Sequence, residues 1–352
     1  MDIYSIYLLI AIILSISIKN NQIDHTRARK TYCVILGIIL FLIAALRSTS
    51  VGIDSERYAW HFYNLQQLDF QGIIDYYQSE LGFYFLVKLL TFISSDHQIM
   101  FAFIGAIYAY SISRFIYNYS IEPMVSFIML IPMVYFAFTL TGLRQTMALS
   151  ILLISIDYIL DRRLLKFLLI VFIASLFHQS ALFFAPAYII KNKNITFKRI
   201  FLYLAFMPIV FLLRPFIVRA VQFFLYSSYS IDWSQSAGGW STLSTYVLIL
   251  IVATIFKKQL EKQNGNFPFF FTMMYIGTLI QMFVPLQPNI FRVSMYYNIA
   301  SIILIPGILK TQKDRVSKLI AYTIFFVLMG VQYYVFTFNA AGVQPYKFFW
   351  QY

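Results

Sequence analysis

The chain has 352 residues, of which 60% are hydrophobic and only 12% are charged, and its mean hydropathy is +0.73. Soluble domains carry roughly 25% charged residues, and a soluble fold of this length cannot bury so much apolar surface. The composition therefore excludes that class and predicts an integral membrane protein. The net charge of +13 comes mainly from short connections between apolar runs, where it sets membrane topology and gives no reason to expect a nucleic-acid partner.

Apolar runs that are long enough to cross a bilayer, or nearly so, follow one another along the whole sequence. The first run follows no basic segment, so we expect it to be retained as a span and not removed as a signal peptide. We predict an all-α, polytopic protein of about 12 transmembrane helices that forms one membrane domain over residues 1–352. The single runs are 3–18, 32–46, 99–118, 123–139, 143–160, 200–214, 241–256, 267–284, 290–309 and 319–338.

One further run, 164–190, is interrupted at His178-Gln179-Ser180. We interpret it as a broken pair of helices, one that ends at His178 and one that returns to Ile190. Each half is short for a full crossing, so the polar residues at the break are expected to face a cavity within the depth of the membrane.

Lysines and arginines in short loops orient the helices, because such loops stay in the cytoplasm. Five basic connections fall on one side if both termini face outward, which leaves the long loops 47–98 and 215–240 outside. Within the first of these loops, residues 54–80 have aromatic and apolar positions at roughly helical spacing, which predicts helices that lie in the membrane interface. The five basic connections are 19–30, 161–166, 191–199, 257–262 and 310–318.

Residues 81–94 do not fit this topology as a full crossing, because an extra span would reverse every later loop. The segment is short and contains Lys88, so we treat it as re-entrant or interfacial.

Lysine obeys the predicted topology and arginine does not. All 14 lysines except Lys88 and Lys347 fall on the predicted cytoplasmic side, whereas six of the 13 arginines fall outward or in the outer half of a span. Topogenesis treats the two residue types alike, so it does not explain the difference. The six are Arg47, Arg57, Arg144, Arg214, Arg219 and Arg292.

An arginine near the bilayer needs a partner, because its burial there costs roughly 2.5–3.5 kcal/mol. Its planar fork of donors suits phosphate or carboxylate. Any single outward arginine is more often a snorkelling or ion-paired residue, and Arg57 and Arg219 fit that description. Arg47, Arg144 and Arg292 differ because each lies at the mouth of a long apolar span. The outward acids can pair with only some of these arginines, so we predict an anionic ligand, with phosphate as the first candidate.

Two carboxylates follow Arg47 closely in the sequence. Asp54 and Glu56 could bind a divalent metal or act as a base. Asp54 could equally cap a helix that begins near residue 55.

Glu80 and His178 are further candidates for chemistry. Glu80 directly precedes the segment 81–94 and is a candidate functional carboxylate, although it could simply pair with Lys88. A lone histidine in an apolar run is usually a packing residue, but the place of His178 at a break raises the alternative of an acid or base that lines a cavity. The sequence contains no Walker loop and no HExxH motif, so ATP-driven chemistry is not expected.

These polar residues lie in short motifs, and the order and spacing of the motifs resemble those of a known family. The motifs are Arg47…Gly52-x-Asp54-x-x-x-Tyr58, Glu80-x-Gly82-Phe83, Gly142-Leu143-Arg144-Gln145-x-x-Ala148, Phe177-His178-x-Ser180-Ala181, Arg292 with Tyr296-Tyr297, and Pro345-Tyr346-x-Phe348. Along most of its length the chain resembles the EpsG family of Wzy-type bacterial polysaccharide polymerases.

The resemblance implies a glycosyltransferase of the bacterial inner membrane whose active site faces outward. Such an enzyme joins undecaprenyl-diphosphate-linked oligosaccharides into O-antigen, capsule or exopolysaccharide, so both donor and acceptor are lipid-linked glycans. A chain-length regulator and a flippase are the implied partners. The layout also looks like lipid-linked GT-C transferases, many of which bind a metal through paired acids in the first outer loop. Asp54 and Glu56 could imitate that pair, but the family pattern matches only position 54, so no metal or other cofactor is expected.

The expected reaction is attack of an acceptor hydroxyl on the anomeric carbon of the donor, with lipid diphosphate as the leaving group. We expect Arg47, Arg144 and Arg292 to stabilise that diphosphate. Asp54 or Glu80 is expected to accept the proton, with His178 as the reserve candidate. The other predicted substrate-binding residues are Gln145, Tyr58, Tyr296, Tyr297 and Tyr346.

Two other classes of function remain open. A transporter or flippase for an anionic substrate would also line its cavity with arginines, but carriers bind near the bilayer midplane and usually have repeated half-domains, and the sequence contains no such repeat. A ligase or acyltransferase for lipid-linked glycans would share the outer-face site and differ in its acceptor.

Overall fold

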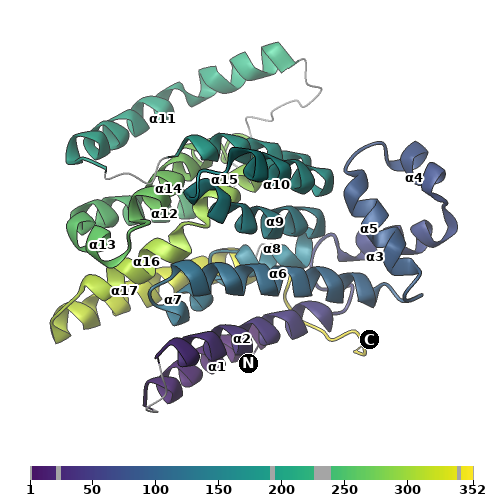
Figure 1. Ribbon diagram of the computed structural model, residues 1–352, viewed down its shortest axis with the longest axis horizontal. Helices are drawn as coiled ribbons and strands as arrows, with labels where there is room; N and C mark the ends of the chain where they lie inside the picture. The colour runs from purple at the N-terminus through teal and green to yellow at the C-terminus, as the bar shows by residue number, and fades with distance from the viewer. Residues whose placement is uncertain (1, 21–24, 191–194, 226–238, 339–341, 352) are drawn as a thin grey trace.

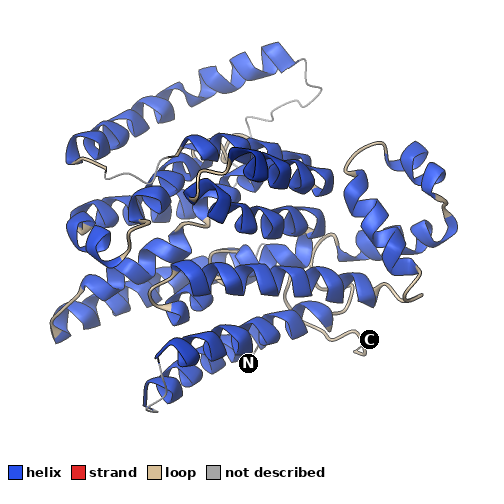
Figure 2. Cartoon of the chain, in the orientation of Figure 1, coloured by secondary structure: helices blue, strands red, loops and turns tan. Residues whose placement is uncertain are grey.

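The computed structural model describes residues 2–20, 25–190, 195–225, 239–338 and 342–351. These residues form helices joined by short connections, and none of them belongs to a β-strand (Figure 1 and Figure 2). The predicted all-α class is therefore confirmed for the described part of the chain.

Five of the described helices are long and apolar enough to cross a membrane. Two bent pairs raise this number to seven: α12 (Trp240–Ile255) with α13 (Lys257–Gln263), and α15 (Phe291–Asn298) with α16 (Ser301–Thr311). The chain is thus a multi-pass membrane protein, but the predicted total of about 12 crossings is not confirmed. The five long helices are α2 (His25–Ala45), α6 (Gln98–Tyr119), α9 (Leu143–Leu160), α11 (Phe197–Leu225) and α17 (Arg315–Gln332).

Several apolar runs that were expected to span fold as shorter helices. The run 123–139 is divided into α7 (Pro123–Met129) and α8 (Tyr135–Thr141), because Val134 between them has a left-handed backbone with φ of 68°. The run 164–190 is divided into α10 (Leu164–Phe177) and the 3-10 helix η1 (Gln179–Ile189), so it breaks at His178 as predicted. The other short elements are α1 (Ile3–Asn20), α14 (Phe267–Gln281), η2 (Pro288–Ile290) and the π-helical turn η3 (Tyr333–Phe338).

The first long loop folds into three helices that we call the loop unit: α3 (Ser55–Gln67), α4 (Phe70–Tyr77) and α5 (Leu81–Thr91). Figure 1 shows this unit at one end of the long bundle. Its buried side chains, among them Phe62 and Val87, form an apolar cluster of their own with the first turns of α6. The helical interpretation of residues 54–80 is confirmed, and residues 81–91 form the third helix of the same unit.

Lys88 is buried inside the loop unit. Its Nζ donates to the backbone carbonyls of Leu65 at 2.9 Å and Gln66 at 3.3 Å, in the last turn of α3. A cation is favourable there, because the last carbonyls of a helix lack intrahelical donors. Lys88 therefore caps α3, and Glu80 is left to other partners.

The second long loop is shorter than predicted. Helix α11 continues through Pro215 to Leu225, so residues 215–225 are helical and not part of a loop. The Nη1 atom of Arg214 donates to the carbonyl of Met282 at 3.2 Å, and this contact joins α11 to the turn after α14. Residues 226–238 of the expected loop lie outside the described residues.

The charged connections separate to opposite ends of the bundle. At the end near the loop unit, the side chain of Gln98 donates to the carbonyl of Arg47 at 3.0 Å. At the other end, Arg29 donates to the carbonyl of Ser120 at 2.5 Å, and Lys310 lies 3.5 Å from Glu122. Arg29 and Lys310 belong to two of the basic connections, 19–30 and 310–318.

Candidate functional site

Three segments that are distant in the sequence meet at the carboxylate of Glu80. Its Oε2 lies 2.5 Å from Nη1 of Arg144, and its Oε1 lies 2.6 Å from Nδ1 of His178. Oε1 also accepts a hydrogen bond of 3.1 Å from the backbone N–H of Gln179. The side chains of Glu80 and His178 are only 8% and 10% exposed. We call Glu80, Arg144 and His178 the Glu80 cluster.

Each member of the Glu80 cluster stands at the end of a helix. Glu80 directly precedes α5 and has a left-handed backbone (φ 53°), as does Gln78 (φ 55°) in the same turn. Arg144 lies in the first turn of α9. His178 directly follows α10 and has an extended backbone, which ends the helix. Two non-glycine residues with left-handed backbone in one short turn cost free energy, and the three contacts of the Glu80 carboxylate offset part of that cost.

Gly82 allows the loop unit to reach the end of α10. A Cβ atom at this position would lie 2.7 Å from Cβ and 3.0 Å from the carbonyl oxygen of Leu176. A side chain would therefore push α5 away from α10. The motif Glu80-x-Gly82 thus combines the carboxylate with the close approach that brings it to His178.

The neighbours of Glu80 keep it ionised. Burial alone would raise its pKa, but the hydrogen bond from His178, the charges of His178 and Arg144, and the N–H of Gln179 outweigh burial and hold the pKa of Glu80 below its usual 4.5. An ionised carboxylate only accepts hydrogen bonds, so Nδ1 of His178 carries the proton. In the neutral imidazole Nε2 is then the acceptor, and this atom is buried with no hydrogen-bond partner among the described residues.

Two tyrosines of α15 form the next layer around η1. The hydroxyl of Tyr296 lies 2.9 Å from Oγ of Ser180, and the hydroxyl of Tyr297 donates to the carbonyl of Phe183 at 2.8 Å. Both rings are buried. These two predicted substrate-binding residues therefore fix the position of the segment that follows His178.

Gln145 and Tyr58 flank the Glu80 cluster. The amide of Gln145 donates to the backbone carbonyl of Arg292 at 2.9 Å and so joins α9 to α15. Tyr58 lies beside the guanidinium of Arg144, as does Tyr84. The structure thus brings together Glu80, His178, Arg144, Gln145, Tyr58 and Tyr296 from the predicted set.

Arg292 and Asp54 are half-buried side chains without a described partner. Neither side chain makes a hydrogen bond or an ion pair with the described residues. Arg292 lies close enough to Tyr296 for its charge to act on that hydroxyl, as does the charge of Glu80. Asp54 precedes α3, but its side chain makes no capping hydrogen bond, so the predicted capping role is not found.

Arg47 lies apart from the Glu80 cluster and is almost completely buried, with 1% exposure. It donates to the carbonyls of Ala44 at 2.6 Å and Leu140 at 3.3 Å, and its guanidinium lies 3.9 Å from the centre of the Phe101 ring. Its contacts therefore join α2, α6 and α8. Nη1 and Nη2 thus point at protein carbonyls, whereas Nε is buried with no hydrogen-bond partner among the described residues. The predicted contact of Arg47 with a diphosphate stays a prediction.

The C-terminal segment covers Arg47 and explains the motif around Tyr346. The hydroxyl of Tyr346 donates to the carbonyl of Ile43 at 2.8 Å, and an isolated β-bridge joins Arg47 to Phe348. Gly52 completes the junction: its φ is +96°, and a Cβ there would lie 2.2 Å from the carbonyl oxygen of Leu140. Tyr346 therefore belongs to a structural junction.

The sequence analysis missed an aromatic group next to the Glu80 cluster. The Nδ1 atom of His61 lies 3.0 Å from the hydroxyl of Tyr77, whose ring stacks on Tyr84 with centroids 3.6 Å apart. Burial, and then the positive charges of Arg57 and Arg144, lower the pKa of His61 to about 4, so its ring is neutral at neutral pH. The helical spacing of Tyr58 and His61 was a signal for this group, because residues three apart share a helix face.

Acidic side chains do not gather into a metal site in the described part of the chain. No group of three His, Cys, Asp or Glu side chains is close enough to hold an ion there.

Comparisons with known proteins give one match. The EpsG family model matches residues 30–350, a region that contains every member of the Glu80 cluster. No curated protein and no solved structure matches the chain.

Proposed function

The chain belongs to the EpsG family of Wzy-type polysaccharide polymerase-like proteins, and from this membership we propose that it polymerises oligosaccharide repeat units linked to undecaprenyl diphosphate. The Glu80 cluster is the proposed active site, on the outer face of the bacterial inner membrane. The observation that carries the proposal is the buried Nε2 atom of His178, which has no described partner while Nδ1 contacts Glu80.

His178 is the proposed general base. The acceptor hydroxyl gives its proton to Nε2, and the ionised Glu80 stabilises the imidazolium that forms. Glu80 is a weaker candidate for this role, because its lowered pKa makes it a poor base and three donors already occupy its oxygens. This assignment differs from the order expected from the sequence, which put Asp54 or Glu80 before His178.

Arg144 and Arg292 are the proposed diphosphate ligands. Arg144 uses Nη1 for Glu80, and its side chain keeps 30% exposure, so its other donors can face a ligand. Arg292 has no described ion partner. Negative charge grows on the leaving diphosphate in the transition state, and guanidinium donors stabilise it there.

The proposed reaction is a single displacement at the anomeric carbon, in which one bond forms and one bond breaks. A bond forms between the acceptor oxygen and the anomeric carbon of the donor, and the bond from that carbon to the phosphate oxygen breaks. The proton moves to His178, and lipid diphosphate leaves as an anion. Asp54, the tyrosines Tyr296 and Tyr297, and the aromatic group around His61 are outside this step.

The test is incubation of the purified protein in detergent with lipid-linked repeat units alone. We expect a ladder of products that differ by one repeat unit. Transfer to another lipid or to a non-glycan acceptor without a ladder would indicate a ligase or an acyltransferase. Movement of the unchanged lipid across a vesicle membrane without new bonds would indicate a flippase.

A further inference from the structure

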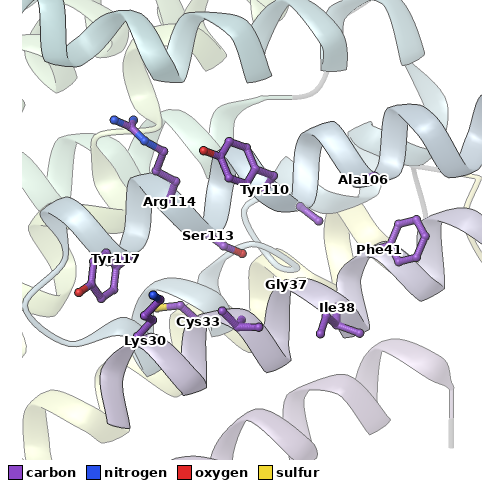
Figure 3. A pocket seen from close by; sticks show the side chains of 12 residues that line it. Lys30, Cys33, Gly37, Ile38, Phe41, Ala106, Tyr110, Ser113, Arg114 and Tyr117 are labelled. Atoms are coloured by element: carbon purple, nitrogen blue, oxygen red, sulfur yellow. The ribbon is translucent and has the colours of Figure 1, made fainter. Parts of the chain in front are cut away.

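An apolar groove with a volume of about 430 Å³ lies between α2 and α6, and none of the residues of the Glu80 cluster lines it. Apolar and small side chains line most of it, and several of them are open to the surroundings: Val34, Ile38 and Tyr110 are 50%, 51% and 64% exposed. In a membrane protein, such a groove opens to lipid. Figure 3 shows its lining residues on the two helices.

The groove follows one face of each helix. Its α2 lining begins at Lys30 and ends at Phe41, and its α6 lining begins at Ala106 and ends at Tyr117. Figure 3 shows Lys30 and Tyr117 at one end and Phe41 and Ala106 at the other. At 1.5 Å per residue, the α2 stripe is roughly 16 Å long, which is about half of the hydrocarbon thickness of a bilayer. The groove therefore matches the depth of one leaflet.

The end at Lys30 is positively charged. Lys30 is exposed and makes no hydrogen bond or ion pair with the described residues. The other cation of the groove, Arg114, is paired with Asp157, so the uncompensated charge belongs to Lys30. This end also carries the basic connection 19–30, which the sequence predicts to be cytoplasmic.

We propose that the groove binds an anionic phospholipid of the cytoplasmic leaflet. One acyl chain lies along the stripe from Cys33 to Phe41, and the phosphate lies at Lys30. Charge and length both favour this occupant: a lysine near the surface of an anionic leaflet strengthens binding, and the groove is as long as one leaflet is deep.

A second groove provides an internal control. It lies between α12, α16 and α17, has a volume of about 350 Å³, and the described residues that line it include no charged side chain. Ile324, which is 52% exposed, lines this second groove as Ile38 lines the first. The two grooves therefore differ in charge at comparable size.

Quenching of tryptophan fluorescence by dibrominated lipids tests the proposal. The full-length protein carries Ile38→Trp or Ile324→Trp, and the parent protein gives the signal of the four native tryptophans. At Ile38→Trp, we expect dibrominated phosphatidylglycerol to be preferred over dibrominated phosphatidylcholine by about fivefold, the factor that one lysine supplies. At Ile324→Trp, we expect no preference.

Two further substitutions locate the binding site. In the Ile38→Trp protein, Lys30→Gln should remove the preference, and Lys258→Gln, at an exposed lysine of α13, should keep it. Ala106→Phe, at an exposed position of the groove, should weaken quenching by both lipids because the new ring occupies the acyl chain's place. Equal quenching by both lipids, the same preference at both tryptophans, or no effect of Lys30→Gln or Ala106→Phe would overturn the proposal.

Discussion

His178 and Glu80 are 98 residues apart in the chain, yet Nδ1 of the histidine lies 2.6 Å from Oε1 of the carboxylate. Glu80 belongs to the loop unit, and His178 stands at the break between α10 and η1. The contact therefore joins the imidazole of His178, at the end of α10, to the loop unit, which lies at one end of the long bundle (Figure 1). Most of the predictions below follow from it.

Loss of the imidazole should remove the proposed base. His178→Gln is expected to lower the rate of ladder formation by about 10²–10⁴-fold, the usual contribution of general-base catalysis. The matched control is His97→Gln, since Nδ1 of His97 contacts the hydroxyl of Tyr63 in a different part of the loop unit. Initial rates with purified protein measure the effect, and a His178→Gln enzyme with the parent rate would contradict the base assignment.

Arg144 should contribute through its fork of donors as well as its charge. Arg144→Lys keeps the charge but loses bidentate geometry, so we expect a rate about 10–100-fold lower, which corresponds to roughly 1.5–3 kcal/mol of charge-assisted hydrogen bonding. Arg144→Ala should abolish polymer at unchanged protein level. Arg57→Ala, at an exposed arginine of α3, should retain the parent rate, and the same rate in Arg144→Ala would remove this residue from the mechanism.

The lowered pKa of Glu80 predicts how stability depends on pH. The folded state holds this carboxyl more strongly ionised than the unfolded state does, so its contribution is complete above the usual pKa of 4.5 and is lost as the pH falls through the lower folded value. The parent protein should be more stable than Glu80→Gln at pH 7, by roughly 1–3 kcal/mol.

Thermal unfolding of both proteins between pH 7 and pH 3 measures this difference. The gap between their Tm values should be constant at the upper end and should narrow below about pH 5. A gap that widens on acidification would mean that Glu80 is not ionised in the folded protein.

The close packing of Gly82 against Leu176 of α10 should be essential for the contact between Glu80 and His178. In Gly82→Ala the new methyl group would lie 2.7 Å from Cβ of Leu176, so α5 must move and the contact between Glu80 and His178 is expected to lengthen. Ladder formation should fall sharply. Gly330→Ala is the matched control, because a Cβ there meets nothing within 4 Å. Gly330 lies in the last turn of α17, where alanine should not destabilise the helix. Equal activity of the two variants would contradict the packing argument.

Arg47 should behave as a structural residue. Arg47→Leu removes the side-chain donor to the buried carbonyl of Ala44, at a cost of about 1–3 kcal/mol. The carbonyl of Leu140 keeps the hydrogen bond of 3.0 Å from Oγ of Ser55. We expect a lower Tm and less protein in the membrane. The protein that does fold should keep its KM for the lipid-linked substrate, and a raised KM at unchanged Tm would instead support a role in diphosphate binding.

The sequence predicted much of the local structure, because the apolar runs and their polar breaks are local signals. The break at His178 is where it was expected, and residues 54–80 are helical. The predicted number of about 12 crossings is not confirmed, because five described helices, or seven with the two bent pairs, are long and apolar enough to cross a membrane. Run length alone does not reveal a turn inside a run. Val134 illustrates this point, since its left-handed backbone interrupts the run 123–139 two residues after Pro132. The proline was a local signal of the break that run length alone did not use.

The candidate site was predicted as a set of residue types but not as a geometry. Arg47 and Arg144 both stand at the mouths of spans, and only the fold distinguishes them: Arg47 turns toward backbone carbonyls and Arg144 toward Glu80. Gln179 contributes its backbone N–H, which any residue except proline can supply. Side-chain patterns do not reveal such a donor, and this agrees with the open position in the motif Phe177-His178-x-Ser180.

The cover over Arg47 has a consequence for biosynthesis. Tyr346 contacts Ile43 across 303 residues, so the ribosome makes the end of α2 long before the segment that closes this junction. Until residues 346–348 have been made, Arg47 lacks its backbone bridge to Phe348, and the end of α2 lacks the hydrogen bond from Tyr346 to Ile43. Completion of this region is therefore a late event, which follows synthesis of the helices that lie between the two segments.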